Sequence, residues 1–160
     1  GVNPLAIARA LVSNIKTGQV VSGGSTITMQ VAKLLDPKPR RLSAKLIEGF
    51  RALQLEWHLS KMEILRLYLS IAPYGGNIEG IEAAARLYLG KSPEQLTLSE
   101  AALLVAIPRN PNPNLYRPDL HLKEALALRE RILSELFKRG FLQEKEWREA
   151  MAIAPKISQR

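Results

Sequence analysis

Residues 23–30 read Gly23-Gly24-Ser25-Thr26-Ile27-Thr28-Met29-Gln30, a glycine pair followed by hydroxyl side chains and an amide. Two adjacent glycines let the backbone approach a ligand closely or adopt a positive φ. The Ser and Thr residues are favoured helix N-caps, so hydroxyls and unpaired N–H groups gather where the dipole of the next helix is positive. The stretch predicts a helix that begins within residues 25–28 and runs to Leu35. Its first turn is either an anion cradle or an ordinary cap.

Helical periodicity continues on both sides of this stretch, and no segment shows the alternation of a strand. Pro108, Pro111, Pro113 and Pro118 enforce an extended loop of about ten residues. Capping signals open three helices: Ser60–Glu63, Asn77, and Thr97–Glu100. The fold class is therefore all-α, with helices expected at residues 3–18, 25–35, 42–59, 60–69, 77–89, 101–107, 120–139 and 144–154.

Composition narrows the class of protein. A chain of 160 residues with 46% hydrophobic residues suits one domain, and its net charge of +8 favours nucleic acid, an anionic membrane surface or a phosphorylated ligand. The absence of cysteine excludes disulfides and thiolate metal sites. No stretch of eighteen apolar residues is present, so the chain contains no membrane-spanning segment of its own. Because it starts at Gly1 and enters a helix pattern at once, it is expected to be a piece of a longer protein.

The titratable residues favour carboxylate chemistry beside fixed positive charge. His58 and His121 are the only histidines of the chain, which disfavours a histidine metal site and a serine–histidine catalytic pair. No metal site is assigned. Glu48 and Glu56 lie eight residues apart and share one face of a helix, as catalysts or as solvated ion-pair residues. A basic cluster beside them indicates a phosphate-bearing ligand or a solvated loop: Lys33, Lys38, Arg40, Arg41 and Lys45. It contains no aromatic residue for base stacking, so nucleic acid is not expected as a partner. Arg129, Arg131, Lys138 and Arg139 are expected to form the solvated face of the long helix.

Several segments in fixed order resemble the glycosyltransferase family 51 domain of class A penicillin-binding proteins, most closely the penicillin-binding protein 1C subclass. The resemblance covers the chain to about Pro118. The segments that carry it are Gly23–Gln30, Lys45-x-x-Glu48, Lys61-x-x-Ile64-Leu65-x-x-Tyr68-Leu69, Gly75-Gly76-Asn77 and Leu98–Leu104 through Pro108–Pro111.

The resemblance implies a lysozyme-like helical domain that polymerises lipid II into glycan strands and releases undecaprenyl pyrophosphate. It assigns Glu48 as the catalytic carboxylate that assists departure of the pyrophosphate, with substrate contacts from Gly24, Ser25, Thr26, Gln30, Lys33, Arg40, Arg41 and Lys45. A divalent cation, magnesium or manganese, is a further candidate at the pyrophosphate. The implied organisation is a membrane-facing flap at 1–22, a catalytic core at 23–118, and helices at 119–160 leading to a transpeptidase domain. The implied location is the periplasmic face of the bacterial inner membrane, with anchoring by an N-terminal helix outside the chain.

The chain departs from the family pattern at Ala44, where the family has arginine, and at Arg66 and Ser70. The motif with the family's general-base glutamate is absent, so the domain is expected to be N-terminally truncated and inactive alone. Two other interpretations remain: a diverged scaffold that binds lipid or cell-wall partners, and a lysozyme-like lytic glycosidase.

Overall fold

The computed structural model describes residues 25–37, 39, 42–110 and 112–158. Regular structure in this part of the chain is helical, with one isolated β-bridge between Pro73 and Glu79. The all-α prediction is therefore confirmed. The chain forms two compact units that divide between Ile71 and Ala72. The divisions at residues 22 and 118 stay predictions, and the expected helix 3–18 and the flap 1–22 lie outside the described residues.

The first unit contains helices α2 (Ile27–Leu35), α3 (Leu42–His58) and α4 (Lys61–Ile71). Capping residues explain where two of them begin. The Thr26 hydroxyl accepts a hydrogen bond from the Met29 amide at 3.3 Å, and Ser60 and Glu63 form the predicted capping box before α4. These starts agree with the sequence prediction, and α4 ends at Ile71.

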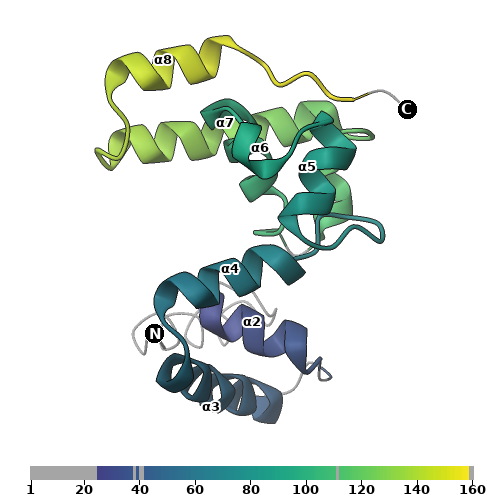
Figure 1. Ribbon diagram of the computed structural model, residues 1–160, viewed down its shortest axis with the longest axis vertical. Helices are drawn as coiled ribbons and strands as arrows, with labels where there is room; N and C mark the ends of the chain where they lie inside the picture. The colour runs from purple at the N-terminus through teal and green to yellow at the C-terminus, as the bar shows by residue number, and fades with distance from the viewer. Residues whose placement is uncertain (1–24, 38, 40–41, 111, 159–160) are drawn as a thin grey trace, which may run out of the picture. The chain divides into compact units, whose positions relative to one another are not determined.

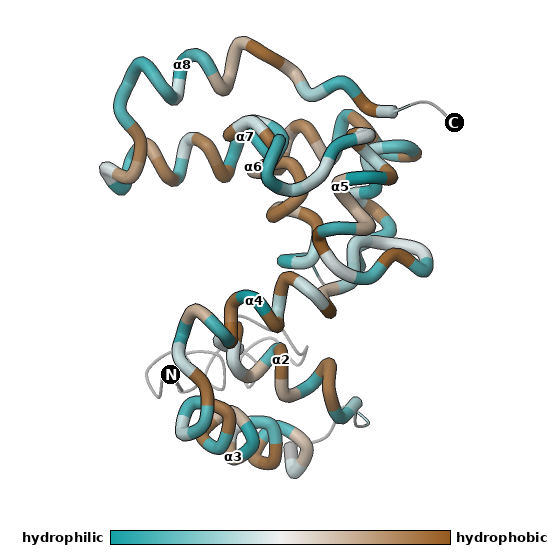
Figure 2. Tube along the Cα trace, in the orientation of Figure 1, coloured by the Kyte–Doolittle hydropathy of each residue, from teal (hydrophilic) through white to brown (hydrophobic). Residues whose placement is uncertain are grey.

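Small side chains on α3 let the helices of this unit pack closely. Val31 of α2 is fully buried, and α3 faces the interior with Ala44 and Ala52, which are 6% and 0% exposed. Residues eight apart lie on the same face of a helix, so the two alanines leave room for α2 along that face. The outward side of α3 carries large apolar side chains instead: Leu46, Phe50, Leu53 and Trp57. Hydrophobic and hydrophilic positions therefore mix along α3 in Figure 2.

The second unit contains α5 (Ile81–Leu89), η1 (Pro93–Gln95), α6 (Leu98–Ala106), η2 (Pro113–Tyr116), α7 (Leu122–Lys138) and α8 (Glu144–Ala152). Helix α6 is its centre, because it packs against α5, α7 and α8. Its core includes several alanines and a set of large, fully buried side chains, among them Tyr74, Tyr88, Leu103, Leu104 and Leu133. No helix in the described parts of either unit combines the length and apolar character needed to cross a bilayer.

The predicted start of α5 at Asn77 is wrong. The backbone before α5 is used in a bridged turn: the Tyr74 amide donates to the Ile78 carbonyl at 2.8 Å, and the Gly80 amide donates to the Ala72 carbonyl at 3.0 Å. Gly80 then takes the N-cap position with φ of +82°, a conformation that favours glycine. The turn, rather than an asparagine cap, sets where the helix begins.

The prediction that Arg129 belongs to a solvated face is also wrong. Arg129 is 2% exposed, and its Nη2 donates to the carbonyls of Ala150 and Met151 at 3.2 and 3.0 Å. Those carbonyls belong to the last turn of α8, where backbone acceptors lack helical partners and the helix dipole is negative. Arg129 therefore caps α8 from α7, whereas Arg131, Lys138 and Arg139 are exposed as expected.

The Gly75-Gly76 turn is shaped by the side chain of Arg117. Gly75 has φ of +97°, and a Cβ atom at this position would lie 2.5 Å from the Arg117 Cγ. The Gly76 amide donates to the side chain of Asn114, which lies within the proline loop. Arg117 is itself held by the Asp119 carboxylate at 2.6 Å. A residue without a side chain is required where the turn meets this arginine.

Candidate functional site

The strongest group of candidate residues lies at the N-terminal end of α2. Ser25 precedes the helix and Thr26 caps it, so both sit where the helix dipole is positive. Lys45 reaches this end from α3, and its Nζ donates to the Ser25 Oγ at 2.7 Å. The structure therefore brings together residues from two separate motifs of the sequence, Ser25 and Thr26 from the first and Lys45 from the second.

Lys45 also pairs with Glu48, one turn further along α3. The Glu48 side chain is 12% exposed and the Lys45 side chain is 47% exposed, so the carboxylate is largely buried while the ammonium remains accessible. A carboxylate removed from water needs such a partner. The arrangement offers an accessible positive charge held in place by a buried negative one.

Gln30 is oriented by a residue that sequence reasoning did not assign. The Tyr68 hydroxyl of α4 donates to the Gln30 Oε1 at 3.3 Å. Since this bond uses the amide oxygen, the Gln30 NH₂ group can still donate to a ligand as far as the described residues are concerned. The signal was present in the sequence, because Tyr68 is the tyrosine of the Lys61–Leu69 motif.

Glu56, the second carboxylate of the helix, has a different environment from Glu48. Its Oε1 accepts a hydrogen bond from the Thr28 Oγ1 at 2.8 Å, and Thr28 is 5% exposed. Thr28 was not singled out in the sequence either. A hydroxyl residue among the apolar positions of α2, opposite a helix with two acids, is the signal that indicates such a bond.

The remaining predicted contacts are only partly described. Lys33 is exposed in the last turn of α2, away from the helix end that carries Ser25. Gly24, Lys38, Arg40 and Arg41 lie outside the described residues. The anion cradle is thus represented in the described part of the chain by Ser25, Thr26, Gln30 and Lys45.

The three departures from the family pattern do not lie in the cluster of Ser25, Lys45 and Glu48. Ala44 is 6% exposed and contributes to the packing of the first unit. Arg66 and Ser70 are exposed on α4, where the Ser70 hydroxyl donates to the Arg66 carbonyl at 2.9 Å. Neither Arg66 nor Ser70 has a side-chain hydrogen bond to the Lys45–Glu48 pair among the described residues, and the Ala44 side chain is a methyl group that cannot form one.

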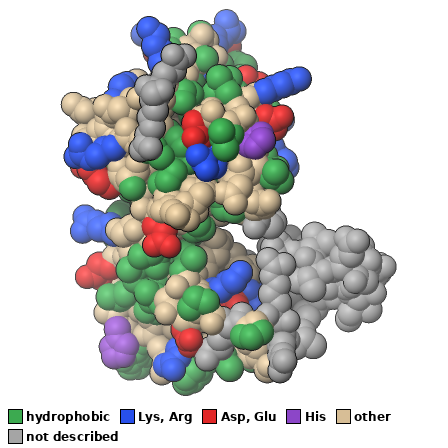
Figure 3. Space-filling view, turned by 90° about the vertical axis from the view of Figure 1, so that its right-hand side faces the viewer, with side chains coloured by type: hydrophobic (Ala, Val, Ile, Leu, Met, Phe, Trp, Pro, Cys, Tyr) green, Lys and Arg blue, Asp and Glu red, His purple; other side chains and the backbone are tan. Residues whose placement is uncertain are grey.

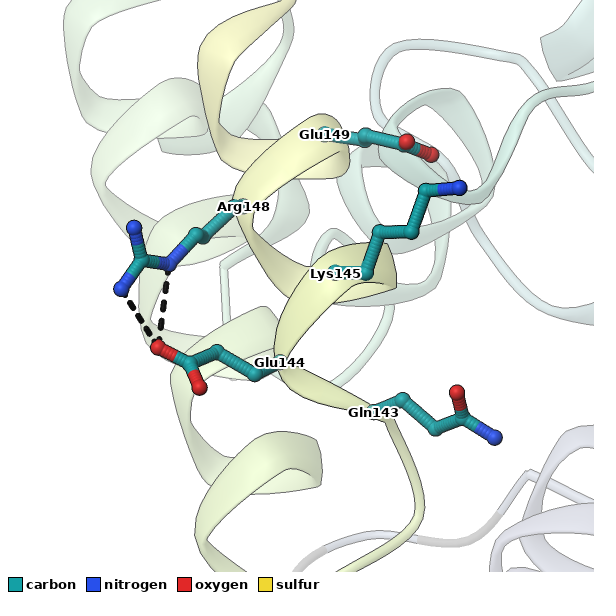
Figure 4. Close-up of a pocket in the computed structure, with 5 residues that line it drawn as sticks. All are labelled: Gln143, Glu144, Lys145, Arg148 and Glu149. Atoms are coloured by element: carbon teal, nitrogen blue, oxygen red, sulfur yellow. Dashed lines mark hydrogen bonds and ion pairs between the residues drawn. The ribbon is translucent and has the colours of Figure 1, made fainter.

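Two other features of the structure do not coincide with this cluster. Within the described ranges, no three His, Asp or Glu side chains gather as a metal site would require. A shallow hollow on α8 is lined by Gln143, Glu144, Lys145, Arg148 and Glu149 (Figure 4). The Glu144–Arg148 ion pair spans one side of it, and it contains none of the predicted site residues.

Comparison with known proteins identifies the family of the chain. The transglycosylase family model matches residues 1–137. Penicillin-binding protein 1C of Escherichia coli is 51% identical over 140 residues, which are 88% of this chain and 18% of that protein. Penicillin-binding protein 1A of Aquifex aeolicus is 39% identical over 152 residues, 94% of this chain and 21% of that protein.

Among solved structures, penicillin-binding protein 1A from Haemophilus influenzae is similar with a TM-score of 0.56 and 25% identity, over 84% of this chain and 17% of that one. The chain spans about a fifth of the length of these relatives. A match over 137 of its 160 residues, at the motifs that carry the resemblance, shows that the chain belongs to the transglycosylase family of the penicillin-binding proteins.

Proposed function

We propose that this chain is part of a peptidoglycan glycosyltransferase that polymerises lipid II into glycan strands during cell-wall synthesis. One observation carries the proposal: Lys45 is shared between Ser25 and the half-buried Glu48 at the positive end of α2. An accessible cation held this way fits a pyrophosphate, the leaving group of lipid II.

The residues of the site have distinct tasks in this reaction. The acceptor hydroxyl forms a bond to the anomeric carbon of the donor sugar, and the bond from that carbon to the pyrophosphate oxygen breaks. Negative charge then grows on undecaprenyl pyrophosphate, where the Lys45 ammonium and the first amides of α2 stabilise it. Glu48 holds Lys45 in place and assists the departure. Ser25, Thr26 and the Gln30 amide donate further hydrogen bonds to the substrate.

The proton of the acceptor hydroxyl requires a general base. We assign this role to a glutamate supplied by a segment N-terminal to Gly1, so residues 1–160 alone are proposed to bind the lipid pyrophosphate weakly without polymerising it. A divalent cation on the pyrophosphate would add to the charge of Lys45. The proposed setting is the periplasmic face of the inner membrane, in a protein that also carries a transpeptidase domain.

The test is polymerisation of fluorescent lipid II by a full-length protein that carries this chain. Glu48→Gln is expected to lower kcat by about a hundredfold or more, because it removes the charge that holds Lys45 and assists the leaving group. Glu82→Gln is the matched control, since Glu82 is an exposed helical carboxylate paired with Arg86. The melting temperature of both variants is measured alongside.

Each outcome discriminates between functions. Loss of glycan product with an unchanged melting temperature supports the transferase. Unchanged product from Glu48→Gln contradicts the assigned role of Glu48. Absence of product from the wild type, together with binding of lipid II, supports a scaffold, and release of fragments from finished glycan supports a lytic glycosidase.

A further inference from the structure

Glu56 joins α3 to the first turn of α2 by a part-buried polar contact. The Thr28 Oγ1 donates to the Glu56 Oε1 at 2.8 Å, and Thr28 is only 5% exposed. A threonine inside a helix usually bonds to a carbonyl of its own helix or points to solvent. Here the hydroxyl bonds to a carboxylate of another helix, a charge-assisted bond that is stronger than a bond between neutral groups.

The position of this contact matters because α2 is short. The helix has nine residues, so few interactions fix its rotation about its own axis. Thr28 lies between two candidate ligand-binding residues, three positions after Ser25 and two before Gln30. Any rotation of α2 would move the Ser25 hydroxyl relative to the Lys45 ammonium, which it meets at 2.7 Å.

Glu48 and Glu56 therefore serve different purposes although they share a helix face. Glu48 pairs with the accessible ammonium of Lys45, whereas Glu56 receives a hydroxyl that is buried in the packing between helices. We propose that Glu56 is a positioning residue, which through Thr28 holds α2 in the rotation that places Ser25 against the Lys45–Glu48 pair. This role rests on the proposed glycosyltransferase function.

The test compares three variants in a full-length protein that carries this chain: Glu56→Ala, Glu56→Gln and Thr28→Val. Glu56→Ala and Thr28→Val each remove the bond, and kcat for lipid II polymerisation is expected to fall by about ten- to a hundredfold, the usual effect of misplacing a reacting group. Combining the two is expected to cost less than the sum of the single effects, because both variants remove the same bond. Glu56→Gln keeps an acceptor for the Thr28 hydroxyl and is expected to restore most of kcat.

A matched control separates positioning from general stability. Glu63→Ala breaks the capping box that starts α4, where Glu63 accepts hydrogen bonds from the Ser60 amide and hydroxyl at 2.8 and 2.7 Å. This variant is expected to lower the melting temperature and leave kcat unchanged. Hydrogen exchange of the amides in residues 27–35 gives a readout that is independent of activity, with faster exchange in Glu56→Ala and Thr28→Val than in Glu63→Ala.

The outcomes distinguish this inference from the function on which it rests. Wild-type kcat and wild-type exchange in Glu56→Ala would overturn it. If Glu56→Gln is as inactive as Glu48→Gln, Glu56 takes part in proton transfer itself and the positioning role is wrong. The wild type could make no glycan while the amides of α2 still exchange faster in Glu56→Ala and Thr28→Val. In that case the proposed function is wrong, but the Thr28–Glu56 bond still fixes the position of α2.

Discussion

The two units of this chain differ in the kind of side chains that form their interiors. In the second unit the fully buried side chains include large ones, such as Tyr88, Leu103 and Leu104, beside several alanines. In the described part of the first unit the 0% exposed side chains are small, Val31 and Ala52, while Met29, Ile64 and Tyr68 are 2–7% exposed. The large apolar residues of α3 remain exposed, Trp57 by 87%. Hydrophobic side chains that reach the surface are visible in green on the face shown in Figure 3.

Side-chain hydrogen bonds in the first unit converge on the first turn of α2. Contacts from Lys45, Glu56 and Tyr68 reach α2 at residues 25, 28 and 30, all within the motif that carries the candidate site. The comparison indicates that the large buried core residues and the candidate site residues lie in different parts of the sequence. Substitutions in the core of the second unit are expected to change the free energy of unfolding. Substitutions at the side-chain contacts between α2 and its neighbours in the first unit are expected to change kcat of the proposed reaction.

The largest expected effect on stability comes from truncating the core of the second unit. Leu104→Ala is expected to lower the free energy of unfolding by about 2–5 kcal/mol, because Leu104 is fully buried and its loss leaves a cavity. Leu53→Ala is the matched control, since Leu53 is 56% exposed on α3, and it is expected to change that free energy by less than about 0.5 kcal/mol. Urea unfolding of the chain, followed by circular dichroism, measures both. Equal losses would contradict the contrast between the units.

The arginine cap of α8 is expected to give the next largest effect. Arg129→Met keeps the length of the side chain but removes the donor to the carbonyls of Ala150 and Met151, at a cost of about 2 kcal/mol. Arg131→Met on the same helix replaces an exposed arginine and serves as the control. The free energy of unfolding is measured as before. An unchanged value for Arg129→Met would mean that water replaces the guanidinium without cost.

A smaller effect is expected at the turn before α5. Gly75→Ala combines a positive φ with a contact against the Arg117 side chain, and it is expected to cost about 1–2 kcal/mol. Gly140→Ala provides a comparison, because Gly140 also has a positive φ of +75° but has no atom within 4 Å of a Cβ atom built there. The difference between the two variants isolates the contact with Arg117. Equal costs would assign the whole effect to the backbone.

The smallest effect depends on pH and concerns Glu100. Burial raises the pKa of this carboxyl, but the Lys91 ammonium at 2.7 Å and the Thr97 amide and hydroxyl outweigh burial, so its pKa is lowered. A lowered folded-state pKa gives stability that is present above the unfolded-state pKa and is lost as the pH falls through the folded-state value. The difference in melting temperature between wild type and Glu100→Gln is therefore expected to shrink below about pH 4. A constant difference down to pH 3 would contradict the assignment.

Local signals in the sequence were sufficient to predict most helices. Capping residues such as Thr26, Ser60 and Thr97 each act on the next turn of backbone, so their effect is visible in a single sequence. Asn77 was misassigned as a cap because the competing turn depends on a bond from Gly80 back to Ala72, across eight residues. Arg129 was misplaced because its partners lie on another helix, 21 and 22 residues away.

In the candidate site, too, the residues marked by local motifs were predicted and the contacts between helices were not. Ser25, Lys45 and Glu48 belong to motifs with their own local patterns, and the structure brings them together. The Thr28–Glu56 and Gln30–Tyr68 bonds depend on how helices pack, over separations of 28 and 38 residues. Helical periodicity specifies which residues share a face, but it does not specify which face of the next helix they meet.

The two tryptophans of the chain fall one to each unit, which gives the protein its own pair of fluorescent reporters. Trp57 is 87% exposed on α3, whereas Trp147 is half-buried on α8 and stacks on Phe137 with ring centroids 4.9 Å apart. The exposed indole emits at longer wavelength and is quenched readily by iodide. A Trp57→Phe variant would report on the second unit alone, and a Trp147→Phe variant on the first. Ligand binding to one unit and unfolding of the other can thus be followed by tryptophan fluorescence, without an attached label.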